Sequence, residues 1–163
     1  MTIASMLETV KFSGAFAGTK FAKNLFLYDK KKKERMWLVI CTHDCTFNMN
    51  ELTKFLGVGS GNLRGADPEV MEAVIGAKAG GVNLFAILND PENKVKLVMD
   101  QTLYTDFEFV AFHPMQNDHT TAIKKGDLKK IIDISKHEPL NVDFTALGGG
   151  AAAVKPVAEK KEA

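Results

Sequence analysis

The sequence predicts a single domain of mixed α/β (α+β) class, and three observations carry that prediction. The 163 residues are the length of one ordinary domain with one hydrophobic core. An apolar fraction of 45% beside 25% charged residues is typical of a globular protein and not of a disordered or membrane-spanning one. Predicted hairpins are mixed with isolated helices without strict alternation, which favours a mixed sheet over a doubly wound parallel one.

A hairpin opens the predicted sheet. Residues 21–28 are aromatic or branched and apolar on both faces, a pattern typical of a buried central strand. The charged stretch 29–35 predicts a turn, and the apolar residues 36–41 predict a second strand antiparallel to the first. These two strands are the predicted start of the sheet.

Two helices are predicted next, with a loop or short strand between them. Residues 48–56 carry an apolar stripe, and Asn48 or Asn50 can serve as the N-cap. The second helix is predicted to begin with Asp67 as its N-cap and Pro68 in its first turn.

The C-terminal half is predicted to contain mostly extended segments. They lie at residues 82–88, 95–99, 107–112, 120–123 and 138–144. A short helix is predicted at 127–134, with Asp127 as its N-cap. The domain is assigned to residues 1–145. Residues 146–163 are small, then charged and low in complexity, and predict a flexible tail or a linker.

Charge and cysteine content narrow the classes of partner and the compartment. The formal net charge of +1 argues against wide coating of a nucleic-acid duplex, and no DNA partner is expected. No secretory signal and no run long enough to span a bilayer is found, so no membrane partner is expected. Cys41 and Cys45 are the two cysteines and provide no disulfide framework, which favours a reducing, cytoplasmic location.

Lys23 is the first candidate functional residue, because it interrupts an apolar strand. Strand periodicity places its side chain on the same face as Phe21, Leu25 and Leu27. Such a lysine must reach an edge, pair with an acid, or project into a cavity that receives an anion. The sequence leaves these alternatives open.

A pair of glycines and a histidine are the next candidates. Gly80 and Gly81 precede an apolar run and can let backbone N–H groups approach a ligand, although a tight loop explains them equally well. His113, at a strand end, can line a pocket as a donor or as a neutral imidazole, or can be an ordinary histidine. His119 and His137 are predicted to be surface residues.

A metal site is the remaining alternative from the residues themselves. Cys41, His43 and Cys45 alternate and could project three ligands from one strand face. Zinc sites usually draw ligands from two separated pairs, and the sequence has no second Cys/His pair. No metal and no cofactor are therefore expected.

Three segments together resemble a known family. KNLFLYDKK, GGVNLFAILND and FHPMQNDHTTAI are similar, in the same order, to the signature segments of the prolyl-tRNA editing-domain family of the YbaK type. The resemblance covers residues 20–144. It implies one mixed α/β domain with a curved, largely antiparallel mixed sheet flanked by helices, and hydrolysis of the ester that joins a wrong amino acid to tRNA(Pro).

The resemblance also implies roles for individual residues. Lys23 corresponds to the essential lysine of the family, and Asn24 follows it as in the alanine-specific branch. The glycine-led loop, usually G-x-x-x-P, corresponds to the five residues Gly80, Gly81, Val82, Asn83 and Leu84. His113 corresponds to a histidine that shapes the amino-acid pocket in some members. Two departures are Leu84, which replaces the loop proline, and a segment before Lys23 that is shorter than in many members.

The function implied is that of an aminoacyl-tRNA deacylase acting on Ala-tRNA(Pro) as a proofreading module. The implied partners are the acceptor end of tRNA(Pro) and prolyl-tRNA synthetase or a multi-synthetase complex. An alternative is a catalytically weakened domain of the same kind that binds tRNA or a synthetase without hydrolysis.

Overall fold

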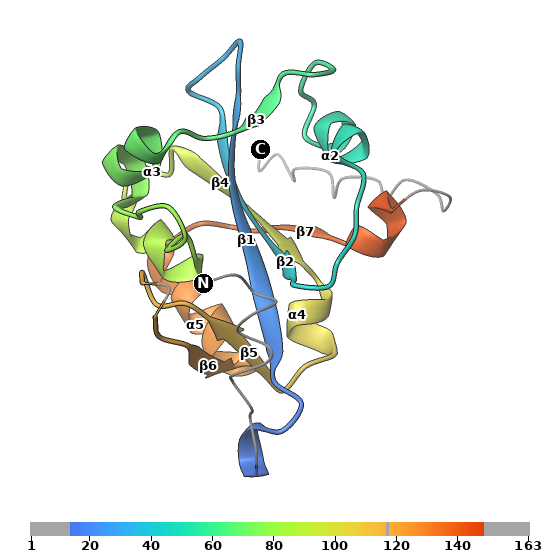
Figure 1. Ribbon diagram of the computed structural model, residues 1–163, viewed down its shortest axis with the longest axis vertical. Helices are drawn as coiled ribbons and strands as arrows, with labels where there is room; N and C mark the ends of the chain where they lie inside the picture. The colour runs from blue at the N-terminus through green and yellow to red at the C-terminus, as the bar shows by residue number, and fades with distance from the viewer. Residues whose placement is uncertain (1–13, 117, 149–163) are drawn as a thin grey trace, which may run out of the picture.

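The computed structural model describes residues 14–116 and 118–148. Within them the chain forms a mixed α/β domain with one open seven-stranded sheet, as predicted (Figure 1). Residues 1–13 and most of the predicted tail lie outside the described residues. Residues 146–148 are described and belong to the last helical turn and its cap. No helix in the described ranges has the length and apolarity needed to cross a bilayer.

The predicted hairpin is the centre of the sheet. β1 (Lys20–Asp29) and β2 (Met36–Thr42) pair in antiparallel fashion. All seven residues of β2 are buried, which explains why its sequence is apolar without alternation. The other edge of β1 is shared by two short partners, β5 (Phe109–Phe112) at its beginning and β3 (Leu63–Gly65) at its end.

The remaining strands extend the sheet on both sides, in the order β6-β5-β1-β2-β4-β7 with β3 on β1. They are β4 (Val95–Asp100), β6 (Thr121–Lys124) and β7 (Leu140–Val142). The pairs β1–β5, β2–β4 and β4–β7 are parallel, whereas β1–β2, β1–β3 and β5–β6 are antiparallel. Parallel pairing therefore has a larger share in the mixed sheet than the sequence suggested.

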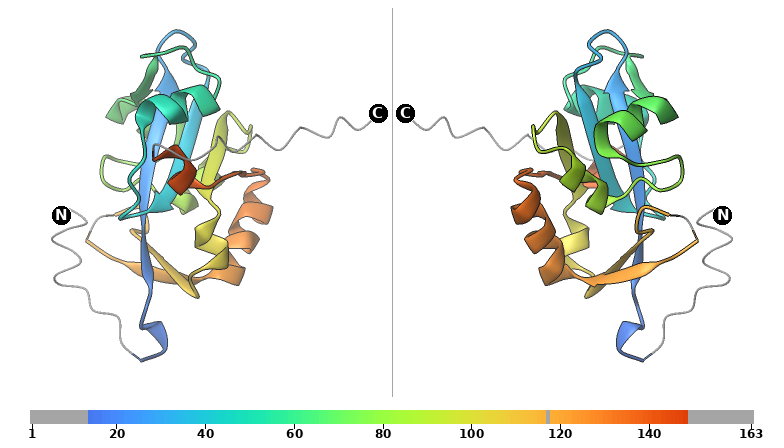
Figure 2. Two further views of the ribbon diagram at one scale, coloured as in Figure 1. Left: turned by 90° about the vertical axis from the view of Figure 1, so that its right-hand side faces the viewer. Right: turned by 90° about the vertical axis from the view of Figure 1, so that its left-hand side faces the viewer.

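Helices cover both faces of the sheet. Figure 1 shows α3 and α2 on opposite sides of the β1–β2 hairpin, and the two views of Figure 2 show each side in turn. The helices are η1 (Gly14–Phe16), α2 (Met49–Phe55), α3 (Pro68–Ile75), η2 (Leu84–Asn89), α4 (Thr102–Thr105), α5 (Lys125–Ser135) and η3 (Phe144–Leu147).

Each face of the sheet has its own hydrophobic core. The first core lies on the side of α3, η2, α4 and α5 and includes Leu38, Ile40 and Leu97. The second lies on the side of α2 and η3 and includes Trp37 and Val39. The alternation of β2 residues between the two cores follows from the two-residue period of a strand.

Residues 82–88 are not the predicted strand. Leu84–Asn89 form the 3-10 helix η2, because the side chain of Asn83 caps it. Asn83 Oδ1 accepts hydrogen bonds from the backbone N–H groups of Phe85 at 2.7 Å and Ala86 at 3.3 Å. A short apolar run fits a strand or a buried helix equally well by periodicity, and here the local cap decides for the helix.

The three predicted helix N-caps agree with the structure to different degrees. Asn48 caps α2, with its side chain accepting from the Asn50 N–H at 2.8 Å, as predicted. Asp67 holds the N-cap position of α3 without a capping side-chain bond. Asp127 is not a cap, because α5 begins at Lys125 and Asp127 pairs with Lys130 at 2.6 Å within the helix.

The prediction that His137 lies on the surface is wrong. His137 is 4% exposed, and its Nε2 lies 3.2 Å from Asp90 Oδ2. Its Nδ1 lies 2.8 Å from the Ser135 carbonyl oxygen. Asp90 also accepts a hydrogen bond from the Val95 N–H at 2.7 Å. The pair therefore joins the end of η2 to the segment after α5, across 47 residues of sequence.

We expect His137→Ala to lower the free energy of unfolding by about 2 kcal/mol, the value of a hydrogen bond to a charged group. Asp90 keeps its bond to the Val95 N–H, so the loss stays below the cost of a fully unpaired buried charge. Urea unfolding followed by circular dichroism measures this change in the free energy of unfolding. The exposed His119 provides the control, since His119→Ala should change stability little; equal losses in both variants would contradict the buried pair.

Candidate functional site

Lys23 lies in the middle of the sheet, opposite Cys41 of the neighbouring strand. Its side chain shares a face of β1 with Leu25 and Leu27, which pack on the second core. The ammonium nitrogen lies 5.8 Å from the centroid of the Phe47 ring, a distance at which a cation is attracted to the aromatic face. The lysine is thus half-buried, with its charge beside an aromatic ring.

The charge of Lys23 has no acidic partner among the described residues. No ion pair or hydrogen bond of its ammonium group to them is found. Lys20, three residues earlier on the same strand, pairs with Asp44, and the hydrogen bond from Lys20 lowers the pKa of the Asp44 carboxyl. Of the alternatives for Lys23, structural pairing with an acid therefore fails across residues 14–116 and 118–148.

The two cysteines lie beside Lys23 and stay protonated. Burial, followed by the proximity of Cys45, raises the pKa of Cys41 to about 12. Burial and then the charge of Asp100 also raise the pKa of Cys45. Thiols in this state are poor nucleophiles and poor metal ligands. In the described part of the chain no three His, Cys, Asp or Glu side chains converge on a point that could hold a metal, so the Cys41/His43/Cys45 interpretation gains no support.

Asn24 lies on the opposite face of β1 from Lys23, since side chains alternate along a strand. It occupies the edge of β1 between the residues paired with β5 and those paired with β3. Its side-chain Oδ1 is buried and has no hydrogen-bond partner in the described residues. A buried acceptor without a partner is uncommon and marks a position where a ligand donor would be favourable.

The glycine loop requires its two glycines. Gly80 has a φ of +82°, a left-handed conformation that residues with a Cβ rarely adopt. A Cβ on Gly81 would lie 2.5 Å from the Met115 carbonyl oxygen, which is too close for any side chain. The loop from α3 to η2 therefore packs directly against the segment that follows β5.

Asn83 ties this loop to His113. It is 0% exposed, and its Nδ2 donates to the carbonyl oxygens of Gly81 and His113, each at 2.7 Å. With its Oδ1 capping η2, the side chain is fully engaged inside the protein. Leu84 is also 0% exposed and belongs to the first core. Both residues support the loop from within.

His113 is oriented by a backbone partner. Its Nδ1 lies 2.8 Å from the His119 carbonyl oxygen, which only accepts, so Nδ1 carries the proton and Nε2 is left for another contact. β1 and β5 are parallel with Phe21 opposite Ala111. The pairing goes no further, because β5 ends at Phe112 and His113 follows it directly. His113 therefore lies just beyond the residues of β5 that pair with β1.

The structure thus brings the glycine loop and His113 together at the end of β5. They are joined by hydrogen bonds, and β5 is the parallel neighbour of β1, the strand that carries Lys23. Lys23 and Asn24 point to opposite faces. The hydrogen bonds by which Asn83 joins the glycine loop to His113 were not predicted. Their only signal in the sequence is an asparagine directly before an apolar run.

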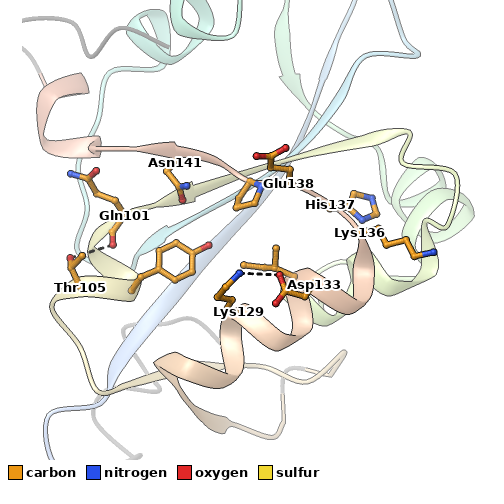
Figure 3. Close-up of a pocket in the computed structure, with 11 residues that line it drawn as sticks. Gln101, Thr105, Lys129, Asp133, Lys136, His137, Glu138 and Asn141 are labelled. Atoms are coloured by element: carbon orange, nitrogen blue, oxygen red, sulfur yellow. Dashed lines mark hydrogen bonds and ion pairs between the residues drawn. The ribbon is translucent and has the colours of Figure 1, made fainter. Parts of the chain in front are cut away.

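A separate hollow lies between α4, α5 and the segment leading into β7 (Figure 3). Its volume is about 850 Å³, and its rim includes Tyr104, Lys129, Asp133, Glu138 and Asn141. Lys129 pairs with Asp133 at 3.1 Å, so acids and bases balance there. None of the residues predicted for the site lines this hollow.

The sheet order and the lysine, glycine-loop and histidine segments define a mixed α/β domain with a lysine in its central strand. A family model described as "Aminoacyl-tRNA editing domain" matches residues 1–131. The chain belongs to this aminoacyl-tRNA editing-domain family, which confirms the resemblance drawn from its three segments.

Individual relatives agree with this assignment. "Prolyl-tRNA synthetase associated domain-containing protein 1" of Bos taurus is 41% identical over 124 residues, covering 76% of this chain and 71% of the relative. "Prolyl-tRNA editing protein ProX" of Acetoanaerobium sticklandii is 32% identical over 110 residues, covering 68% and 65%. The crystal structure of "hypothetical protein APE2540" superimposes with a TM-score of 0.56 at 18% identity over 83% of this chain and 78% of that one, which shows the fold alone.

Proposed function

We propose that the protein is an aminoacyl-tRNA deacylase that removes alanine from mischarged tRNA(Pro). Membership of the editing-domain family and the name of the ProX relative support an editing role. One observation carries the proposal: the ammonium group of Lys23 lies in an apolar sheet and has no acidic partner among the described residues. A half-buried cation without an acidic partner, in apolar surroundings, favours the binding of an anion beside it.

The reaction needs little covalent chemistry from the protein. Water adds to the ester carbonyl carbon, and the tetrahedral intermediate expels the terminal ribose oxygen, so that alanine and free tRNA result. The Lys23 ammonium stabilises the negative charge that develops in this step or holds the nearby phosphate. A neighbouring ribose hydroxyl positions the water. The protonated state of Cys41 and Cys45 is consistent with a mechanism that uses no protein nucleophile.

The glycine loop supplies backbone donors to the substrate. The Gly81 N–H donates to the Lys78 carbonyl at 2.9 Å. The N–H groups of Gly80 and Val82, which are not fully buried, make no hydrogen bond to another described residue. Donors fixed in position before the substrate arrives need no reorganisation during the reaction. They orient the carbonyl group of the bound amino acid.

Selectivity for alanine follows from the limits of a synthetase pocket. A pocket built for proline rejects a smaller side chain by only about 10- to 200-fold, which makes a second, hydrolytic selection useful. That second pocket must admit alanine and exclude proline. His113, held by the His119 carbonyl and joined to the glycine loop, is placed to limit its size.

We expect His113→Ala to widen the amino-acid preference more than it lowers the rate of ester cleavage. The ratio of kcat/KM for Ala-tRNA(Pro) to that for Pro-tRNA(Pro) should fall by about 10-fold or more, the range that one change in pocket size produces. His119→Ala is the matched control, because it keeps the backbone carbonyl that hydrogen-bonds His113. An unchanged ratio in His113→Ala would remove this residue from the pocket.

The chief alternative is a domain that binds tRNA or a synthetase without hydrolysis. Leu84 in place of the family's loop proline and the short segment before Lys23 gave this alternative its support. The structure places Leu84 at the first position of η2, where proline is favoured for its fixed φ, and the Asn83 side chain caps the same turn. The cap substitutes for the rigidity of proline, which favours the enzyme.

A deacylation assay with Ala-, Cys- and Pro-tRNA(Pro) tests the proposal. We expect hydrolysis of Ala-tRNA(Pro), slower hydrolysis of Cys-tRNA(Pro), and none of Pro-tRNA(Pro). Binding of all three without hydrolysis would establish the alternative. Relatives named for association with prolyl-tRNA synthetase suggest that enzyme as a partner, and a cytoplasmic location remains a prediction.

A further inference from the structure

We infer that the tip of the β1–β2 hairpin binds the sugar-phosphate backbone of the tRNA acceptor stem. The lysine tip consists of Lys30, Lys31, Lys32 and Lys33, which lie in the connection 30–35 together with Arg35 and one exposed acid, Glu34. This inference rests on the proposed function, because it assigns the second contact of the same substrate. It gives a role to a charge cluster that the chemistry at Lys23 leaves unused.

The lysine tip is a concentrated and unpaired positive charge. All four lysines are exposed, and none forms an ion pair with a described residue. Most other exposed lysines described have acidic partners, as Lys129 has Asp133 and Lys130 has Asp127. The charge at the tip is therefore available to an external anion.

The tip is held in a defined shape. Asp29 is buried, its Oδ1 accepts from the Lys31 N–H at 2.9 Å, and its Oδ2 pairs with Arg35 at 3.3 Å. Arg35 also donates to the Leu56 carbonyl at 3.1 Å and lies 5.2 Å from the Trp37 ring. Because the turn is anchored by these contacts, binding an anion requires little ordering of the backbone.

The spacing between the tip and Lys23 fits one tRNA end. Seven residues of extended strand separate Lys23 from Lys30, a distance of about 23 Å at 3.3 Å per residue. Figure 1 shows the hairpin projecting from one end of the molecule, beyond the helices. An ester bound at Lys23 places the unpaired 3′ nucleotides along the domain and the first base pairs of the acceptor stem near the tip.

The distribution of charge indicates along which face of the domain the unpaired RNA strand runs. On the α3 side, Asp67, Glu69 and Glu72 are exposed and outnumber the two exposed cations Arg64 and Lys78. On the α2 side, which is also the side of Lys23, Glu51 is matched by Lys54 at 2.7 Å, and residues 57–62 carry no charge. A polyanion is repelled by the first side and tolerated by the second.

A local patch also reconciles RNA binding with a net charge of +1. Affinity for a nucleic acid depends on the number of phosphates that lysine and arginine neutralise, and each releases counterions on binding. A few lysines in the right place suffice for a short contact. The patch adds backbone contacts, which position the substrate without reading its sequence.

The test is binding of an uncharged acceptor-stem minihelix with a 3′ CCA end, measured by fluorescence anisotropy over a series of salt concentrations. The variant is Lys31→Gln/Lys32→Gln/Lys33→Gln. We expect its Kd to rise by about 10-fold or more near 0.1 M salt, and the slope of log K against log salt to become shallower by about 2 to 3. The control is Lys129→Gln/Lys130→Gln/Lys136→Gln, which removes the same charge from exposed positions on and just after α5 and should bind as the wild type does.

A second substrate separates this inference from the proposed function. The ester of alanine with adenosine alone lacks the stem, so the lysine-tip variant should hydrolyse it at the wild-type rate. Wild-type protein that hydrolyses neither ester refutes the deacylase, while the minihelix measurement still tests the tip. Equal minihelix binding by the lysine-tip variant and the wild type overturns the inference, as does a variant that loses only its binding to a synthetase.

Discussion

Lys23→Ala is expected to lower kcat/KM for deacylation of Ala-tRNA(Pro) by about 100- to 1,000-fold, the usual cost of removing one group that stabilises an oxyanion. The side chain is half-buried beside Phe47 and has no acidic partner in the described residues. Its removal therefore breaks no ion pair among them, and the domain should remain folded. Initial rates with a fixed batch of Ala-tRNA(Pro), together with circular dichroism of the variant, measure both expectations.

Lys20→Ala is the matched control for this variant. Lys20 lies on the same strand but is paired with Asp44, so its removal should affect stability slightly and catalysis little. Lys23→Arg keeps the charge but changes the shape and hydrogen-bonding pattern of the side chain. It should therefore retain more of the substrate affinity than of the deacylation rate. Turnover of Lys23→Ala equal to that of the wild type would exclude the lysine from the mechanism.

Asn83→Ala is expected to destabilise the domain by about 4 kcal/mol and to abolish measurable deacylation. The change removes two donor bonds, to the Gly81 and His113 carbonyls, and two acceptor bonds that cap η2. Each buried group left unpaired costs about 1–3 kcal/mol. The glycine loop would also lose its attachment to the segment after β5, so the substrate donors would lose their positions. Urea unfolding and initial-rate kinetics give the two values.

Two further variants isolate the role of the Asn83 amide. Asn83→Asp keeps an acceptor for the cap of η2 but turns an ionised oxygen toward the Gly81 and His113 carbonyls. It should lose activity while helix content is retained. Asn89→Ala, at the other end of η2, removes one bond to the Ile75 carbonyl and should be close to neutral for activity. Full activity of Asn83→Asp would show that the loop needs no such attachment.

The centre of the fold was predictable because several local signals agree there. The charged turn at 29–35 separates two apolar runs, and the antiparallel register follows. The structure adds that Asp29 and Arg35 close this turn. The same reasoning could not separate a strand from a buried helix at residues 82–88, since the run is short and periodicity alone does not distinguish them.

The candidate site was predictable only in part, because its connections are long-range. Lys23 is visible in the sequence as a charge within an apolar strand. The bonds from Asn83 to His113 and from His137 to Asp90 join residues 30 and 47 apart in sequence. Nothing in the local pattern near His137 indicates burial, which is set by the packing of α5 against η2.

The central claim is that the ammonium group of Lys23 receives the aminoacyl end of the tRNA. The most direct test follows the side-chain NMR signals of the lysines while a non-hydrolysable amide analogue of alanyl-adenosine is added, with the Lys23 signal assigned by its loss in Lys23→Arg. We expect the Lys23 signal to shift with saturation, while that of Lys20, held by Asp44, stays in place. A saturating analogue that leaves the Lys23 signal unmoved would contradict the claim.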